Sequence, residues 1–157
     1  MDVCVVLGSK SDLPIAEKCT TLLTEFDIPH EVRVASAHRA PKYLESVVDE
    51  AVDSGCKIFI GMAGMAAALP GVIASMTTLP VIGVPVGGKV PLDSLLSIVQ
   101  MPPGMPVATV GVDRGDNAAA LAIQMLALGD SDLARRYDSW RVEKTAKVIA
   151  DDESLQE

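Results

Sequence analysis

Short apolar runs alternate with helical stretches along the whole sequence, and this alternation constrains the fold more than any other feature. Residues 3–7 are apolar at every position, as expected of a strand that helices cover on both faces. Residues 12–26 then show helical periodicity, with Pro14 in the first turn. Repetition of this unit predicts a parallel sheet between two layers of helices. The predicted strands are 3–7, 31–35, 57–60, 81–84 and 107–110, and the predicted helices are 12–26, 41–54, one emerging from 61–75, 93–99, 117–128 and 131–150.

The 157 residues predict one domain of three-layer α/β/α architecture, with a flavodoxin-like or Rossmann-like sheet. Residues 130–157 are expected to form a C-terminal helix with an acidic tail, and this tail, residues 151–157, is expected to fray. The helix at 117–128 is apolar on almost every side. Such a helix is expected to be buried between the sheet and another subunit.

Composition and charge narrow the class of protein. Hydrophobic residues make up 49% of the chain and the mean hydropathy is +0.33. Every apolar run is nevertheless interrupted before the roughly 18–20 residues that cross a bilayer. The apolar excess therefore predicts a soluble homo-oligomer without a membrane partner. The net charge of −8 argues against a nucleic-acid partner, which requires a basic face.

The cysteines and the first residues indicate a cellular compartment. Cys4, Cys19 and Cys56 are odd in number and lie in apolar segments. Reduced thiols in a core fit this pattern better than a disulfide framework or a metal site. The chain begins Met-Asp-Val-Cys and enters a strand pattern with no basic segment that would mark it for export. We therefore expect a cytoplasmic protein.

Ligands of parallel sheets bind beyond the carboxyl ends of the strands, so three loops are candidate sites. The first is Gly8-Ser9-Lys10-Ser11-Asp12. Gly8 permits a tight turn, while the hydroxyls and the amides at the start of the next helix can hold a phosphate. Asp12 can bind ribose hydroxyls. The alternative is a capped turn without a ligand, because the loop is neither a Walker motif nor GxGxxG.

The second loop, residues 36–41, contains one of only two histidines in the chain. His38 follows the second predicted strand at the carboxyl edge, beside Arg39, which can bind an anion. His30 lies at the entrance of that strand, the amino edge, and is expected to be a surface residue. Any imidazole acid or base is therefore predicted to be His38 rather than His30. The alternative is that His38 is a surface histidine ahead of a helix.

The third loop, residues 63–71, is made of small side chains except for Met65, Leu69 and Pro70. Small residues let the backbone approach a ligand closely, although they serve equally well in tight helix packing. The sequence shows no carboxylate pair, Ser-His-Asp array or metal-ligand cluster. The chemistry available therefore uses little beyond one imidazole and positioned amides.

These loops, in this order and spacing, resemble the class I PurE family, N5-carboxyaminoimidazole ribonucleotide mutase. The similarity covers about residues 3–130. The matching motifs are Gly8-Ser-Lys-Ser-Asp12, Ser36-Ala-His-Arg39 with Pro41, Ala63-Gly64 through Leu69-Pro70-Gly71, Pro80-Val-Ile-Gly-Val-Pro85, Leu92-Asp-Ser-Leu95, Ser97-Ile-Val-Gln-Met-Pro102, Pro106-Val-Ala-Thr109 and Asn117-Ala-Ala.

The resemblance implies an octameric enzyme of purine biosynthesis that moves a carboxylate from the exocyclic nitrogen of an imidazole ribonucleotide to ring carbon C4. It implies no metal or organic cofactor, and carbon dioxide trapped as an intermediate. His38 would be catalytic and move the proton at C4. The implied substrate-binding residues are Gly8, Ser9, Ser11 and Asp12 in the first loop, Ser36, Ala37 and Arg39 in the second, and Ala63, Gly64, Met65, Ala66, Ala68 and Leu69 in the third.

The third loop departs from the family pattern, Ala-Gly-Gly-Ala-Ala-His-Leu-Pro-Gly, at two positions. Met65 replaces the second glycine, and Ala68 replaces the histidine. The related carboxylase class, which uses free carbon dioxide, has a Ser-Asn version of this loop and a lysine at the position of Arg39. Arg39 therefore favours the mutase, and we expect Ala68 to slow the reaction without abolishing it, because losing one charge-assisted contact costs about 1.5–3 kcal/mol.

Three alternatives remain open. The same site could carboxylate aminoimidazole ribonucleotide with free carbon dioxide, or the chain could be a nucleotide-binding paralogue that has lost turnover. A flavodoxin-like electron carrier is disfavoured, since aromatic residues are only 3% of the chain. Lys89 is interpreted as a solvated loop lysine and Trp140 as an interface or packing residue, while spacing assigns no role to Gln100.

Overall fold

A five-stranded parallel sheet forms the centre of the computed structural model, which describes residues 1–156. The strand order is β2-β1-β3-β4-β5, the flavodoxin-like order, and it confirms the predicted fold class. The strands are β1 (Val3–Leu7), β2 (His30–Val34), β3 (Ile58–Ala63), β4 (Val81–Pro85) and β5 (Ala108–Thr109). The helices are α1 (Leu13–Glu25), α2 (Pro41–Asp53), α3 (Leu69–Met76), α4 (Pro91–Val99), α5 (Gly115–Ala127) and α6 (Ser131–Glu153), with the short 3₁₀ helix η1 (Lys10–Asp12) before α1.

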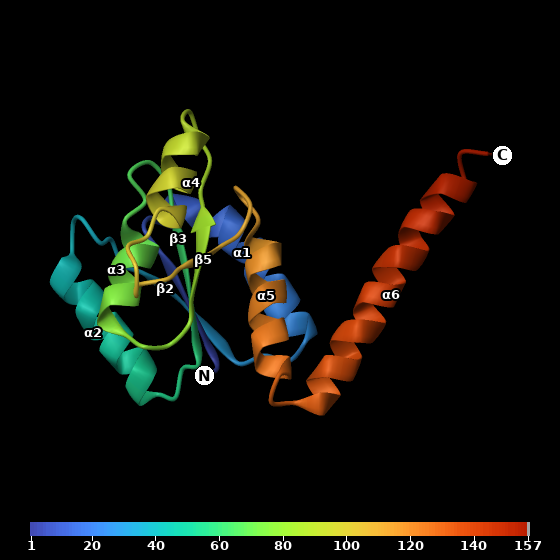
Figure 1. The fold of residues 1–157 in the computed structure, drawn as a ribbon, viewed down its shortest axis with the longest axis horizontal. Coiled ribbons are helices and arrows are strands. Elements are labelled where there is room, and N and C mark those ends of the chain that lie inside the picture. The colour runs from blue at the N-terminus through green and yellow to red at the C-terminus, as the bar shows by residue number, and fades with distance from the viewer. Residues whose placement is uncertain (157) are drawn as a thin grey trace. The chain divides into compact units, whose positions relative to one another are not determined.

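Helices α2, α3 and α4 cover one face of the sheet, and α1 and the start of α5 lie on the other (Figure 1). All residues of β1, β3 and β4 are buried, as the uninterrupted apolar runs predict. Alternate strand residues, such as Cys4 and Phe59, pack with α2 and α3 in one core cluster. The three cysteines are free and buried, as predicted, and burial raises the pKa of Cys4 and Cys19 to about 12.

Two glycines set how closely the helices approach the sheet and one another. A Cβ on Gly83 of β4 would lie 2.3 Å from Cγ2 of Ile98 in α4. A Cβ on Gly115, the first residue of α5, would lie 2.2 Å from the carbonyl oxygen of Ile15 in α1. Any side chain at either position would force the packed elements apart.

Some element bounds differ from those predicted. α4 begins at Pro91 rather than residue 93, because proline suits the first turn of a helix. The expectation that residues 151–157 form a frayed tail is wrong for 151–153, which continue α6. Hydrogen bonds of the helix extend past this point, since Ser154 N donates to Ala150 O. Glu157 lies outside the described residues.

The chain divides into two compact units, Met1–Ala122 and Ile123–Glu157. In the second unit, the Asp130 carboxylate caps α6 by accepting from the amides of Asp132 and Leu133. The Tyr137 and Trp140 rings stack with centroids 5.7 Å apart. None of the helices in the described part of the chain is long and apolar enough to cross a membrane.

Candidate functional site

The strand order places the three candidate loops side by side, because β1 lies between β2 and β3. Connections from β1 and β3 leave in opposite directions along the sheet, which makes this position a topological switch point. Backbone hydrogen bonds continue past the strands: Gly8 N donates to Met62 O (3.0 Å), and Ala35 N donates to Leu7 O (2.9 Å). Segments that are far apart in the sequence therefore form one continuous edge.

The first loop is a capping box that closes on itself. Ser9 N donates to Oδ2 of Asp12 (3.1 Å), and Ser11 N donates to Oγ of Ser9 (3.3 Å). Asp12 N donates to Ser9 O. The loop uses these three amides for its own cap, so the prediction that amides at the start of the helix are free for a phosphate does not hold for Ser9, Ser11 and Asp12.

Asp12 is the only charged residue in the described chain whose side chain the fold buries. Its carboxylate accepts from Ser9 N and from the Ser11 hydroxyl. Burial nevertheless outweighs these hydrogen bonds and raises the pKa of Asp12 above its ordinary value. A buried carboxyl with a raised pKa at the edge of a sheet is a candidate functional group.

The second loop docks on the first through Arg39. Its Nη2 donates to Gly8 O (3.1 Å), while its backbone amide and Nε donate to Oγ of Ser36 (3.2 and 3.4 Å). These contacts hold the guanidinium beside the first loop although its side chain is exposed. His38 precedes Arg39 and is exposed, and Ala37 is half-buried. The sequence places His38 and Arg39 on this loop, and the structure adds the contact between the two loops.

The third loop carries strain at Met65. This residue has a φ of +56°, a left-handed conformation that favours glycine, and its side chain is 82% exposed. Ala67 N donates to Met65 O (2.9 Å) and Ala68 N to Ala66 O (2.7 Å), so the loop is tightly folded before α3. Ala63 and Leu69 bound the loop and are buried, Gly64 and Ala68 are half-buried, and Ala66 is exposed.

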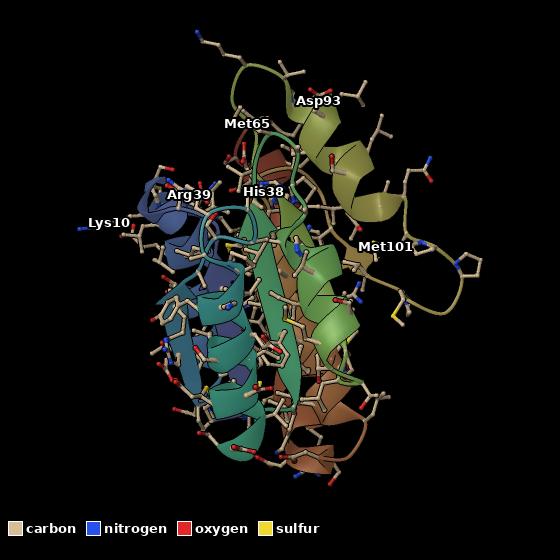
Figure 2. The ribbon with its side chains drawn as sticks, turned by 90° about the vertical axis from the view of Figure 1, so that its left-hand side faces the viewer. Lys10, His38, Arg39, Met65, Asp93 and Met101 are labelled. Carbon is tan, nitrogen blue, oxygen red and sulfur yellow. The ribbon has the colours of Figure 1, made fainter. Side chains whose placement is uncertain are left out.

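His38, Arg39 and Met65 lie at the same end of the sheet, and the Lys10 side chain points away from them (Figure 2). His30 lies at the other end, at the start of β2. Its Nδ1 donates to Ile28 O (2.8 Å) and ties the half-buried ring to the turn before the strand. The two histidines thus occupy opposite ends of the sheet, as predicted.

The sequence reasoning missed the loop after β5 as a neighbour of this edge. Oδ1 of Asp113 accepts from Gly87 N (2.8 Å), which joins the loops after β4 and β5. In the sequence, the glycine pair at 87–88 was the only indication that another segment packs closely against this loop. Lys89 is exposed, as predicted. Next to Gln100, Met101 packs on α3, with its sulfur 3.1 Å from where a Cβ on Gly71 would lie.

The described residues contain no group of three or more His, Cys, Asp or Glu side chains that could hold a metal ion. What the edge offers is an exposed imidazole, a guanidinium, paired hydroxyls and a buried carboxyl. This set can bind a phosphorylated sugar and move one proton.

Comparison with known proteins gives consistent results. The family model described as AIR carboxylase matches residues 2–147. A protein of Methanocaldococcus jannaschii named N5-carboxyaminoimidazole ribonucleotide mutase is 54% identical, over 99% of this chain and 98% of its own length. A Mycobacterium tuberculosis protein of the same name is 47% identical, over 97% of this chain and 88% of its own. The crystal structure of Treponema denticola PurE has a TM-score of 0.88 and 30% identity, with 99% of this chain and 98% of that one covered.

Proposed function

The chain belongs to the AIR carboxylase family, and we propose that it is an N5-carboxyaminoimidazole ribonucleotide mutase of purine biosynthesis. The observation that carries this proposal is the 54% identity to a protein of that name over almost the full length of both chains. The reaction moves the carboxylate of the substrate from the exocyclic nitrogen to ring carbon C4. The strand order supports the proposal, since it brings together the three loops that such a substrate requires.

The nucleotide phosphate binds between the first two loops in this proposal. The amides of Ser9, Ser11 and Asp12 are engaged, so we assign the phosphate to the Arg39 guanidinium and to the Ser9 and Ser11 hydroxyls, with the Ser11 hydroxyl turning from Asp12 to the ligand. The Asp12 carboxylate accepts from the ribose hydroxyls. Further contacts to the nucleotide are proposed for Gly8, Ser36 and Ala37.

His38 moves the proton in the proposed reaction. Cleavage of the N–C bond releases carbon dioxide and leaves the exocyclic nitrogen needing a proton, while C4 attacks the carbon dioxide and must lose its own. One imidazole that gives a proton to the nitrogen as the N–C bond breaks, and then takes the proton from C4, balances the isomerisation. The exposed position of His38, beside the cation Arg39, supports this role.

The loop after β3 covers the imidazole ring and the carbon dioxide, so that recapture outcompetes escape. The proposed contacts come from Ala63, Gly64, Met65, Ala66, Ala68 and Leu69. Ala68 supplies no polar side-chain group, and its amide already donates to Ala66 O. We therefore expect slower turnover than a histidine at this position would allow.

We also propose a cytoplasmic homo-oligomer, an octamer. Apolar side chains on α4 and the loop after it support association, because they remain exposed in the single chain. Leu92, Leu96 and Val99 lie at helical spacing on one side of α4, and Met105 follows in the loop; each is 44–59% exposed. Sedimentation of the purified protein tests the subunit number.

Product formation by the purified protein tests the proposed function. One sample receives N5-carboxyaminoimidazole ribonucleotide and a parallel sample receives aminoimidazole ribonucleotide with bicarbonate, and the ultraviolet absorbance of the ring is followed. We expect turnover of the first alone. Faster turnover of the second would identify a carboxylase, in keeping with the name of the family model. No turnover in either, with the fold intact, would indicate a non-catalytic paralogue.

A further inference from the structure

The loop after β3 rests on the loop after β4, residues 86–90. Val86 N donates to Ala63 O (2.9 Å), and a Cβ on Gly64 would lie 3.3 Å from Val86 O. The backbone of the two loops is therefore in direct contact where the proposed substrate cover begins. A shift of the second loop would move the first.

Asp113, in the loop after β5, holds the loop after β4. Its Oδ1 accepts from Gly87 N (2.8 Å) and its own amide donates to Pro85 O (2.9 Å). Its carbonyl oxygen accepts from Nζ of Lys18 (3.3 Å). Asp113 has a φ of +58°, which aspartate and asparagine tolerate better than most residues. Two contacts thus hold the backbone of Asp113, and its carboxylate accepts from Gly87 N.

The absence of a side chain at Gly87 is required by this contact. A Cβ there would lie 2.6 Å from Oδ2 of Asp113. The φ of Gly87 lies outside the left-handed region, unlike that of Gly88 (+99°). The φ of Gly87 would therefore accept alanine, but its methyl group would have to displace the Asp113 carboxylate.

We propose that Asp113 is a positioning residue of the site. By accepting the Gly87 N–H it fixes residues 86–90, and through Val86 it fixes the loop that covers the substrate. This inference rests on the proposed function, because that function makes the loop after β3 part of the reaction. If the hydrogen bond between Gly87 N and Asp113 served stability alone, its loss would leave substrate binding unaffected.

Asp113→Asn and Asp113→Gly form a matched pair. Both residues adopt the left-handed conformation readily, but only asparagine keeps an oxygen that accepts the Gly87 N–H. We expect Asp113→Gly to raise KM for N5-carboxyaminoimidazole ribonucleotide about tenfold with kcat within about twofold, as for one lost hydrogen bond that acts on binding. Asp113→Asn should restore KM to near the wild-type value.

Gly87→Ala breaks the same contact from the other side, because its methyl group displaces the carboxylate. It should raise KM as well. In the double variant Gly87→Ala/Asp113→Gly the methyl group meets no carboxylate, so the increase in KM should be smaller than the product of the two single effects. A product of independent effects would contradict a shared contact.

Hydrogen exchange of the Gly87 amide provides a readout without turnover. The amide should exchange slowly in the wild type and Asp113→Asn and about tenfold faster or more in Asp113→Gly. Equal exchange in the two variants would overturn the role of Asp113 in holding the loop. Faster exchange with an unchanged KM would overturn its link to the site. Should the wild type convert neither nucleotide, the proposed function fails, whereas the exchange result still decides whether Asp113 holds the loop.

Discussion

The two ends of the sheet are built by different rules. At the amino end, α1 and α2 return to the sheet through residues 26–29 and 54–57, and both turns close with the same backbone hydrogen bonds. Ile28 N donates to Leu23 O, and Cys56 N donates to Ala51 O, as in Schellman motifs. Asp27 and Gly55 occupy the left-handed position that this motif requires. The local conformation at this end is explained by helix termination alone.

At the carboxyl end, local folding alone does not explain several features. Asp12 is buried with a raised pKa, Met65 is exposed and left-handed, and an exposed histidine and arginine stand together. None of these features terminates a helix in the way that Asp27 does. Departures from local consistency concentrate where a protein binds its ligand. The contrast indicates that one end of the sheet is shaped by stability and the other by function.

Replacing each of the two histidines is expected to give the largest difference in kcat between the two ends of the sheet. We expect His38→Asn to fold and bind nucleotide but to lose about 10²–10⁴-fold in kcat, the usual contribution of one acid–base group. His30→Asn should keep kcat within about threefold, because that ring only bonds Ile28 O. Steady-state turnover of both variants makes the comparison. Near-normal turnover in His38→Asn would remove it from the mechanism.

Replacing the left-handed residue Met65 is expected to have a smaller effect, which appears both in the unfolding free energy and in KM. Met65→Gly should raise the unfolding free energy by about 0.5–1 kcal/mol, because glycine relieves the strain at φ +56° but loses more chain entropy on folding. It should also raise KM about three- to tenfold, because the contact with the ligand that we propose for Met65 is removed.

Asp27→Gly is the matched control at the amino end, since Asp27 has a φ of +55°. It should leave KM unchanged and shift the thermal midpoint little, because aspartate tolerates this conformation. Thermal unfolding and KM of the two variants complete the test. An unchanged KM in Met65→Gly would show that the side chain does not cover the substrate.

The smallest expected effect concerns Asp12, whose titration makes the stability of the protein depend on pH. Because its pKa in the folded chain is raised above the ordinary 3.8, the protonated form favours the folded state. The stabilisation by the protonated form is complete below pH 3.8 and is lost as the pH rises through the raised pKa of the folded chain. The stability of Asp12→Asn relative to the wild type should therefore increase with pH over this window. Urea unfolding at several pH values measures the difference, and a difference that falls with pH would contradict the sign.

Much of the sheet could be predicted from the sequence, because its central strands are apolar at every position and the intervening helices carry a 3.6-residue period. Residues 3–7 matched β1 at both ends. The site was predicted less completely. The chain order of loops shows where His38 lies, but not that Arg39 reaches Gly8 O or that Asp113 accepts from Gly87. Such contacts depend on how strands pair, which local patterns do not encode.

Because the chain has only two histidines, proton NMR of their imidazole rings tests the difference between the two ends most directly. Aminoimidazole ribonucleotide is titrated into the protein, and the signals are assigned with His30→Asn. We predict that the His38 resonance shifts with saturation while the His30 resonance stays in place. A saturable shift of His30 alone, or of neither ring, would contradict the assignment of the site to the carboxyl end of the sheet.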